Sequence, residues 1–105
     1  MSRVVDLSNY EFYNNISNDP STSILDVRTQ HEYEQGHIPN AFLIDIYNPA
    51  FQSKIMELCK SKKYYIYCKS GYRSFYAGNF MVQMGFENVH HLKDGIISWT
   101  DNLEM

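Results

Sequence analysis

The residue best placed for chemistry is Cys68, which stands between a predicted strand and a predicted helix. An aromatic and β-branched run over residues 64–67 predicts the strand, and a helical pattern resumes at Ser74. Consecutive backbone N–H groups in such a loop form an anion-binding nest, and the start of the helix adds a partial positive charge. With Lys69 and Arg73, these groups favour a thiolate, so a nucleophilic sulfur is predicted within a cup of N–H donors.

The same loop indicates which reactions suit the cysteine. No general base is evident beside it, because His90 and His91 approach only if their strand pairs with the strand before Cys68. Acyl transfer of the cysteine-protease type is therefore disfavoured. A thiolate that attacks a group whose charge the nest and Arg73 hold suits phosphate esters and sulfur oxyanions alike. The flanking Lys, Gly and Arg argue against a merely structural, buried cysteine.

Other residues of chemical interest are expected to be structural. Asp26 and Arg28 end a predicted strand, and we interpret them as an ion pair or as support for the cysteine loop. Cys59 falls at an apolar position of a helical pattern, so we expect a buried core thiol. His90 and His91 alternate across a strand and cannot both face one metal ion. No metal site and no cofactor are predicted.

Five short runs rich in apolar residues predict strands. They lie at residues 4–5, 24–27, 42–44, 64–67 and 89–92. Helical patterns separate these runs. Two helices begin with capping boxes, formed by Ser8 with Glu11 and by Thr29 with Glu32.

Two further helices are expected later in the chain. The first has Asn48 as N-cap and a proline at its first position. The second, after Cys68, has Tyr76, Phe80 and Met84 on one face. Strands that alternate with helices over short loops predict an α/β fold with a mostly parallel sheet and helices on both faces. Functional residues of such sheets gather at the carboxyl ends of strands, where Cys68 lies.

Composition restricts the classes of protein and partner. The 105 residues suit a single domain over residues 1–105, and a net charge of −3 disfavours nucleic acid and anionic membranes as partners. Two cysteines are too few for a disulfide scaffold. No apolar run has the length of a signal peptide or a membrane helix. We therefore expect a cytoplasmic protein.

At the cysteine loop the sequence resembles the rhodanese-like family of sulfurtransferases. Residues 68–74 are similar to that family's C-x-x-G-x-R-S pattern. Residues 25–28 and 32–41 resemble its L-D-V-R and E-[FY]-x-x-G-H-I-P-x-A motifs, and residues 85–99 resemble G-F-x-x-V-x-x-L-x-G-G-x-x-x-W. The matches lie in order and span nearly the whole chain. Asp94 departs from the pattern by replacing the first of two glycines, which leaves the geometry of that turn open.

The resemblance implies a three-layer α/β fold whose five-stranded parallel sheet has the order 1-5-4-2-3. It implies that Cys68 forms a persulfide, which carries sulfur from a small anion such as thiosulfate to a thiol, cyanide or a sulfur-acceptor protein. It also implies a set of substrate-binding residues, namely Lys69, Ser70, Gly71, Tyr72 and Arg73. The implied supporting residues are Asp26, Arg28 and Ser74.

Two other functions remain open. Phosphatases of the same fold separate their cysteine and arginine by five residues, whereas four residues separate Cys68 from Arg73 here. The smaller ring favours a single sulfur anion over a phosphoryl group. The second alternative is a non-enzymatic sulfur-carrier or regulatory binding domain, although such domains often lack the cysteine.

Overall fold

The computed structural model describes residues 3–105, so the first two residues of the predicted domain lie outside it. Its elements are, in chain order, β1 (Val5–Leu7), α1 (Asn9–Asn18), β2 (Thr22–Asp26), α2 (Gln30–Gln35), β3 (Phe42–Leu43), α3 (Phe51–Met56), β4 (Lys63–Tyr67), α4 (Tyr72–Gln83), β5 (Asn88–Leu92) and the 3-10 helix η1 (Ile96–Ser98). Within the described residues, no helix has the length and hydropathy needed to cross a membrane.

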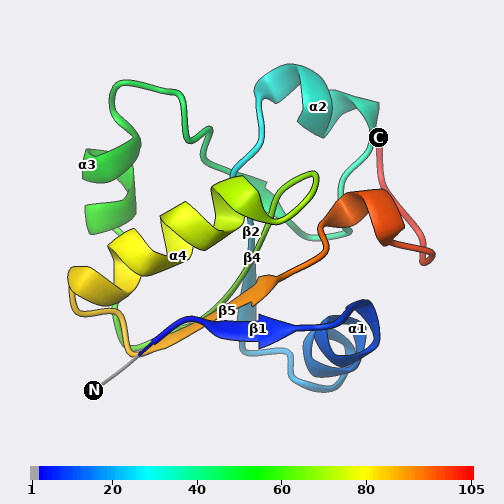
Figure 1. Ribbon diagram of the computed structural model, residues 1–105, viewed down its shortest axis with the longest axis horizontal. Helices are drawn as coiled ribbons and strands as arrows, with labels where there is room; N and C mark the ends of the chain where they lie inside the picture. Colours follow the sequence, from blue (N-terminus) through cyan, green and yellow to red (C-terminus); the bar gives the residue numbers. More distant parts are fainter. Residues whose placement is uncertain (1–2) are drawn as a thin grey trace.

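The five strands form one parallel sheet in the order β1-β5-β4-β2-β3 (Figure 1). This confirms both the predicted fold class and the predicted strand order. The strand before the cysteine, β4, is central and pairs with β2 on one side and β5 on the other. The loop after β4 therefore meets the turns that follow β2 and β5 at the same edge of the sheet.

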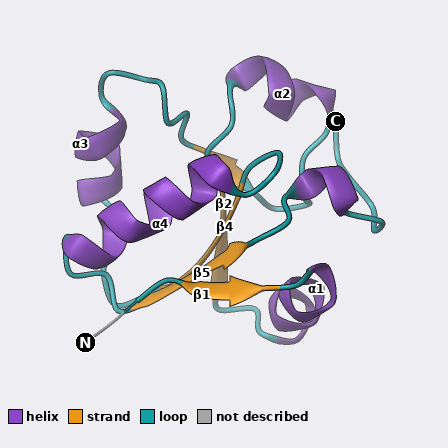
Figure 2. Cartoon of the chain, in the orientation of Figure 1, coloured by secondary structure: helices purple, strands orange, loops and turns teal. Residues whose placement is uncertain are grey.

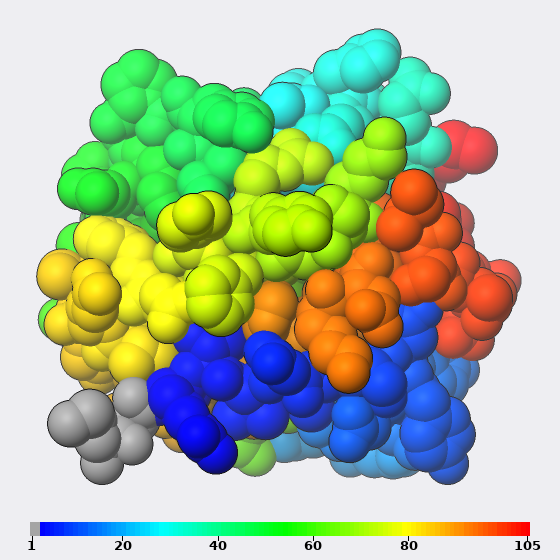
Figure 3. All heavy atoms as spheres, viewed as in Figure 1, coloured from blue at the N-terminus to red at the C-terminus, as the bar shows by residue number. Residues whose placement is uncertain are grey.

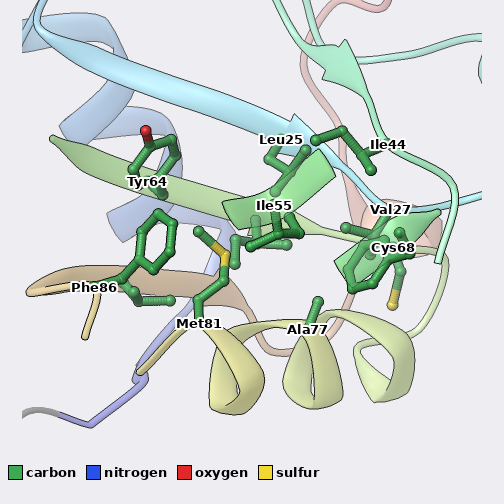
Figure 4. Packing of buried hydrophobic residues seen from close by; sticks show 12 residues of the cluster. Leu25, Val27, Ile44, Ile55, Tyr64, Cys68, Ala77, Met81 and Phe86 are labelled. Atoms are coloured by element: carbon green, nitrogen blue, oxygen red, sulfur yellow. The ribbon is translucent and has the colours of Figure 1, made fainter. Parts of the chain in front are cut away.

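Helices cover both faces of the sheet (Figure 2). The side chains of β4 point alternately toward the two faces. Tyr64 and Ile66 face a core shared with α3 and α4, whereas Tyr65 and Tyr67 face a core shared with α1 and η1. The period of two along a strand accounts for this division. Figure 4 shows the first core, in which Cys68 is packed beside Val27.

Both predicted capping boxes are present and fix the starts of α1 and α2. Ser8 accepts the Glu11 backbone N–H at 3.2 Å, and the Glu11 carboxylate accepts the Ser8 N–H at 2.9 Å. Thr29 and Glu32 make the equivalent pair of hydrogen bonds at 3.2 and 3.1 Å. These local bonds satisfy N–H groups that a helix start would otherwise leave unpaired.

The prediction for α3 was wrong at both ends. The helix begins at Phe51, because the Asn48 side chain accepts the Ala50 N–H at 2.8 Å and forms a turn rather than a cap. It ends at Met56, so the chain has already turned toward β4 when it reaches Cys59. Cys59 is therefore exposed and not the core thiol that we expected.

The buried face of α4 differs in part from the predicted one, because Phe80 and Met84 pack against the core whereas Tyr76 does not. Its buried residues are Ser74, Ala77, Gly78 and Met81, whereas Tyr76 is 71% exposed. The reason is close packing against the sheet: a Cβ at Gly78 would lie 3.0 Å from the Val4 side chain. Small residues therefore make up most of the inward face and Phe80 packs beside it, whereas Tyr72, Phe75 and Tyr76 are exposed.

Candidate active site

Cys68 directly follows β4, and its sulfur is directed toward the first turn of α4 (Figure 4). The residue is 1% exposed. Its Sγ accepts hydrogen bonds from the backbone N–H groups of Gly71, at 3.1 Å, and Ser74, at 3.3 Å. The Ser74 hydroxyl lies 3.5 Å from the same sulfur. The structure therefore brings three of the sequence-predicted residues together around one sulfur atom.

Two glycines hold the cysteine loop against the turn after β5. Gly71 has a φ of 101°, and a Cβ there would lie 2.0 Å from the Lys93 carbonyl oxygen. Gly95 has a φ of 77°, and a Cβ there would lie 2.0 Å from the Lys69 carbonyl oxygen. Each glycine thus admits the backbone of the other segment. Asp94 adopts no positive φ, so its departure from the family pattern leaves the turn intact.

The remaining predicted loop residues, Lys69, Ser70 and Tyr72, have exposed side chains. The first two carbonyl groups of the loop are hydrogen-bonded to η1. The Ile96 N–H donates to the Cys68 carbonyl at 2.9 Å, and the Ile97 N–H donates to the Lys69 carbonyl at 3.0 Å. The carbonyl groups of Cys68 and Lys69 therefore point toward η1 and away from Cys68 Sγ. This orientation leaves N–H groups as the polar backbone atoms around Sγ.

Arg73 is tied to α2 rather than left as a free cation. Its guanidinium makes a two-pronged ion pair with Glu32, at 2.7 and 2.9 Å. Hydrogen bonding to Arg73 lowers the pKa of Glu32 to about 2. The pKa of Arg73 is raised, first by the hydrogen bond to Glu32 and to a smaller extent by the charge of Cys68. Arg73 therefore contributes less charge to the loop than the sequence suggested, and it also holds two helices together.

Asp26 and Arg28 form a buried ion pair at 2.7 Å at the end of β2. Arg28 also donates to the Gly36 carbonyl at 2.7 Å, and its guanidinium lies 5.4 Å from the centre of the Tyr67 ring. Tyr67 immediately precedes Cys68. The pair therefore supports the strand that leads into the cysteine loop, in keeping with the structural interpretation.

One further group at the site was not predicted. His91 Nδ1 lies 3.0 Å from Ser74 Oγ, and His91 Nε2 lies 2.8 Å from the Asp6 carboxylate. The sequence left an approach of His91 conditional on strand order, and β5 does pair with β4. Asp6 stands opposite His91 in the register of β1 and β5. The implied strand order was therefore the signal that would have found both residues.

Comparison with known proteins agrees with this fold. Residues 8–102 match the rhodanese-like domain, and the chain belongs to that family. The crystal structure of a rhodanese-like domain protein from Staphylococcus aureus is 29% identical, with a TM-score of 0.81 over 98% of this chain and 97% of that one. A rhodanese-related protein from Thermoplasma volcanium is 33% identical, with a TM-score of 0.75 over 92% of this chain and 89% of that one.

Curated relatives include longer proteins named tRNA uridine(34) hydroxylase. The protein from Yersinia pestis (strain Pestoides F) is 34% identical over 92 residues, which are 82% of this chain and 25% of the relative. The protein from Buchnera aphidicola subsp. Schizaphis graminum is 37% identical over 92 residues, 82% of this chain and 29% of the relative. The chain thus spans between a quarter and a third of the length of these relatives.

Proposed function

We propose that this chain is a sulfurtransferase that carries a sulfane sulfur as a persulfide on Cys68, with thiosulfate as a donor. The observation that carries the proposal is the position of Sγ, which receives the Gly71 and Ser74 N–H groups at the start of α4. N–H donors and a helix start stabilise an anionic sulfur without a metal or an organic cofactor. We place this reaction in the cytoplasm, where reducing conditions keep a thiol free for chemistry.

The reaction balances in two displacements. The Cys68 thiolate attacks the outer sulfur of thiosulfate, the new S–S bond forms as the old one breaks, and sulfite leaves with the bonding electrons. An acceptor, either cyanide or a thiolate, then attacks the outer sulfur of the persulfide. Cys68 leaves as a thiolate and is ready for another cycle.

In this mechanism the negative charge of the persulfide is stabilised mainly by backbone N–H groups. Arg73 is paired with Glu32, and Lys69 is exposed to solvent. The loop N–H groups are fixed by the backbone and need no reorganisation when the anion forms, which is the condition for effective electrostatic stabilisation. The exposed side chains of Lys69, Ser70 and Tyr72 are then available to contact the donor and the acceptor.

The test is the intact mass of the protein after incubation with thiosulfate. Wild type should gain one sulfur atom, which cyanide removes as thiocyanate. Cys59→Ser provides the matched control, because Cys59 is exposed and lies outside the site, and it should gain the same sulfur. Cys68→Ser should gain none. Retention of the adduct and of turnover in Cys68→Ser would rule out this assignment.

The relatives named tRNA uridine(34) hydroxylase supply a second candidate, an action on tRNA. The net charge of −3 gives this chain little electrostatic attraction for a phosphate backbone. We therefore rank sulfur transfer first. The test is the mass of the nucleosides of tRNA after incubation with the protein. An oxygen atom added to a uridine would favour the second candidate, whereas unchanged nucleosides together with sulfur transfer to a thiol support the first.

A further inference from the structure

A buried histidine is connected to the cysteine through a serine hydroxyl. His91 is 3% exposed and lies 3.0 Å from Ser74 Oγ, which lies 3.5 Å from Cys68 Sγ. On its other side His91 Nε2 lies 2.8 Å from the Asp6 carboxylate, whose side chain is 62% exposed. Four side chains thus form a continuous path from the buried sulfur to the protein surface.

We propose that Asp6, His91 and Ser74 form a proton relay that ionises Cys68. His91 and Asp6 act in it as positioning residues, since they reach the sulfur only through Ser74. The inference deepens the proposed function, because it assigns the origin of the nucleophilic thiolate. It also supplies the general base that the sequence failed to show.

The direction in which the Ser74 hydroxyl donates its proton determines whether Cys68 can lose its own. The hydroxyl lies within reach of three acceptors: the Gly71 carbonyl at 3.1 Å, His91 Nδ1 at 3.0 Å and Cys68 Sγ at 3.5 Å. When the Nε2–H of neutral His91 donates to Asp6, Nδ1 accepts from Ser74. Ser74 Oγ is then free to accept the S–H proton of Cys68.

The proton transfer balances without an external group. The S–H proton moves to Ser74 Oγ as the hydroxyl proton moves to His91 Nδ1, which leaves a thiolate and an imidazolium. Nδ1–H now donates to Ser74, and the Ser74 hydroxyl donates to the thiolate. Every hydrogen bond in the path is kept, with its direction reversed between Cys68 and His91.

The surroundings of His91 suit this charge change. Asp6 supplies the carboxylate that stabilises the imidazolium, and the Phe75 ring of α4 lies with its centre 5.9 Å from that of the imidazole. The other charged or titratable groups on this side line an open pocket of about 510 Å³ beside His91, and they are Tyr72, Tyr76, Lys93 and Asp94. Figure 3 shows the surface where α4 (yellow-green) lies near β1 (blue), and the Asp6 side chain that lines the pocket there is 62% exposed. Protons can therefore exchange with solvent here although Cys68 itself is 1% exposed.

The first test measures the ionisation of Cys68 by the ultraviolet absorbance of the thiolate against pH. Cys59→Ser is the background, and the spectrum of the double variant that also carries Cys68→Ser is subtracted. His91→Asn should move the midpoint upward by about one pH unit, on the scale of losing a nearby opposite charge. Asp6→Asn, at a side chain that is 62% exposed, should move it in the same direction by less.

His90→Asn is the matched control, because His90 is the neighbouring residue and stacks on Tyr65, with ring centres 4.5 Å apart, on the opposite face of β5. It should leave the midpoint unchanged. Midpoints of His91→Asn and Asp6→Asn that equal that of His90→Asn would overturn the relay.

A double-mutant cycle tests whether Ser74 carries the coupling. In a Ser74→Ala background, His91→Asn should cause no further shift of the midpoint. A full His91 effect without the hydroxyl would mean direct action through space and would overturn the relay. The absorbance measurement requires no sulfur donor. It therefore tests the relay independently of sulfur transfer, which is tested by the mass of the protein after incubation with thiosulfate.

Discussion

Gly71 and Gly95 set the distance between the cysteine loop and the turn after β5. Each has a positive φ, and each approaches a carbonyl oxygen of the other segment so closely that a methyl group would overlap it. The two requirements are distinct. A positive φ strains the backbone of any residue other than glycine, whereas the close approach leaves no space for a Cβ atom. Gly85 has a positive φ of 96° but only the Lys60 side chain near its Cβ position, at 3.8 Å or more.

This difference leads to a prediction at the residue scale. Gly95→Ala should lower the free energy of unfolding by more than about 3 kcal/mol, above the ordinary range for one substitution. Gly85→Ala should lower it by only about 1–2 kcal/mol, because it meets backbone strain without overlap. Urea unfolding of both variants provides the measurement. Equal losses would show that the two segments do not need their close contact.

At the scale of elements, the cysteine loop depends on how α2 and α4 are held together. The Glu32–Arg73 ion pair joins the first turn of each helix, and Glu32 also completes the capping box of α2. A single carboxylate therefore fixes the start of one helix and the position of the other. Mutation of Arg73 will consequently change the loop geometry as well as its charge.

The lowered pKa of Glu32 predicts how stability depends on pH. A carboxyl group whose pKa is depressed in the folded state stabilises the fold above its unfolded pKa and loses this effect as pH falls. Glu32→Gln should lower the free energy of unfolding by about 1–2 kcal/mol at neutral pH. The difference from wild type should fade between pH 4.5 and about 2, the two pKa values of Glu32.

Urea unfolding at several pH values measures this difference. Glu34→Gln is the control within the same helix, since Glu34 is exposed and accepts one hydrogen bond from Gln30. It should change the free energy of unfolding by no more than about 0.5 kcal/mol. A Glu32→Gln effect that is constant with pH would contradict the assigned role of the ion pair.

The length of the cysteine loop gives a second prediction at this scale. Four residues separate Cys68 from Arg73, and both N–H donors to Sγ belong to this short segment or its helix. Insertion of one glycine after Gly71 should displace the Ser74 N–H from the sulfur and reduce sulfur transfer by about a hundredfold, the effect of losing one such donor. Wild type should hydrolyse aryl phosphates negligibly, because the ring is too small for a phosphoryl group.

Assays of both activities on both proteins test this reasoning. An insertion after Ser61, in the exposed turn before β4, is the matched control and should leave sulfur transfer nearly unchanged. Phosphatase activity in wild type without thiosulfate activity would instead support the phosphatase alternative.

At the scale of the whole molecule, local signals predicted more than contacts between distant segments. The capping boxes, the apolar runs and the strand order were all available from the sequence, because they depend on neighbouring residues or on a pattern shared by a family. The start of α3 was missed because Asn48 suits a turn as well as a cap. The inward face of α4 was missed in part, because aromatic residues such as Tyr76 outweigh small ones in any hydrophobic pattern.

The same limit applies to the candidate site. Cys68 and its loop are contiguous, so spacing alone indicated them. Arg73 was expected to act on the sulfur. Its partner Glu32 is 41 positions away in the sequence, so the spacing of the loop residues could not reveal the ion pair. Asp6 and His91 are 85 positions apart, and only the pairing of β1 with β5 brings them together.

The hydrogen bonds behind the cysteine loop have a consequence for its motion. Because the Ile96 and Ile97 amides donate to the carbonyls of Cys68 and Lys69, the loop cannot swing outward unless both bonds break together. Deuterium exchange at these two amides should therefore give one common free energy of opening, once each rate is corrected for the intrinsic exchange rate of that amide. NMR-detected exchange measures this free energy, and unequal values for the two amides would show that the two hydrogen bonds open separately.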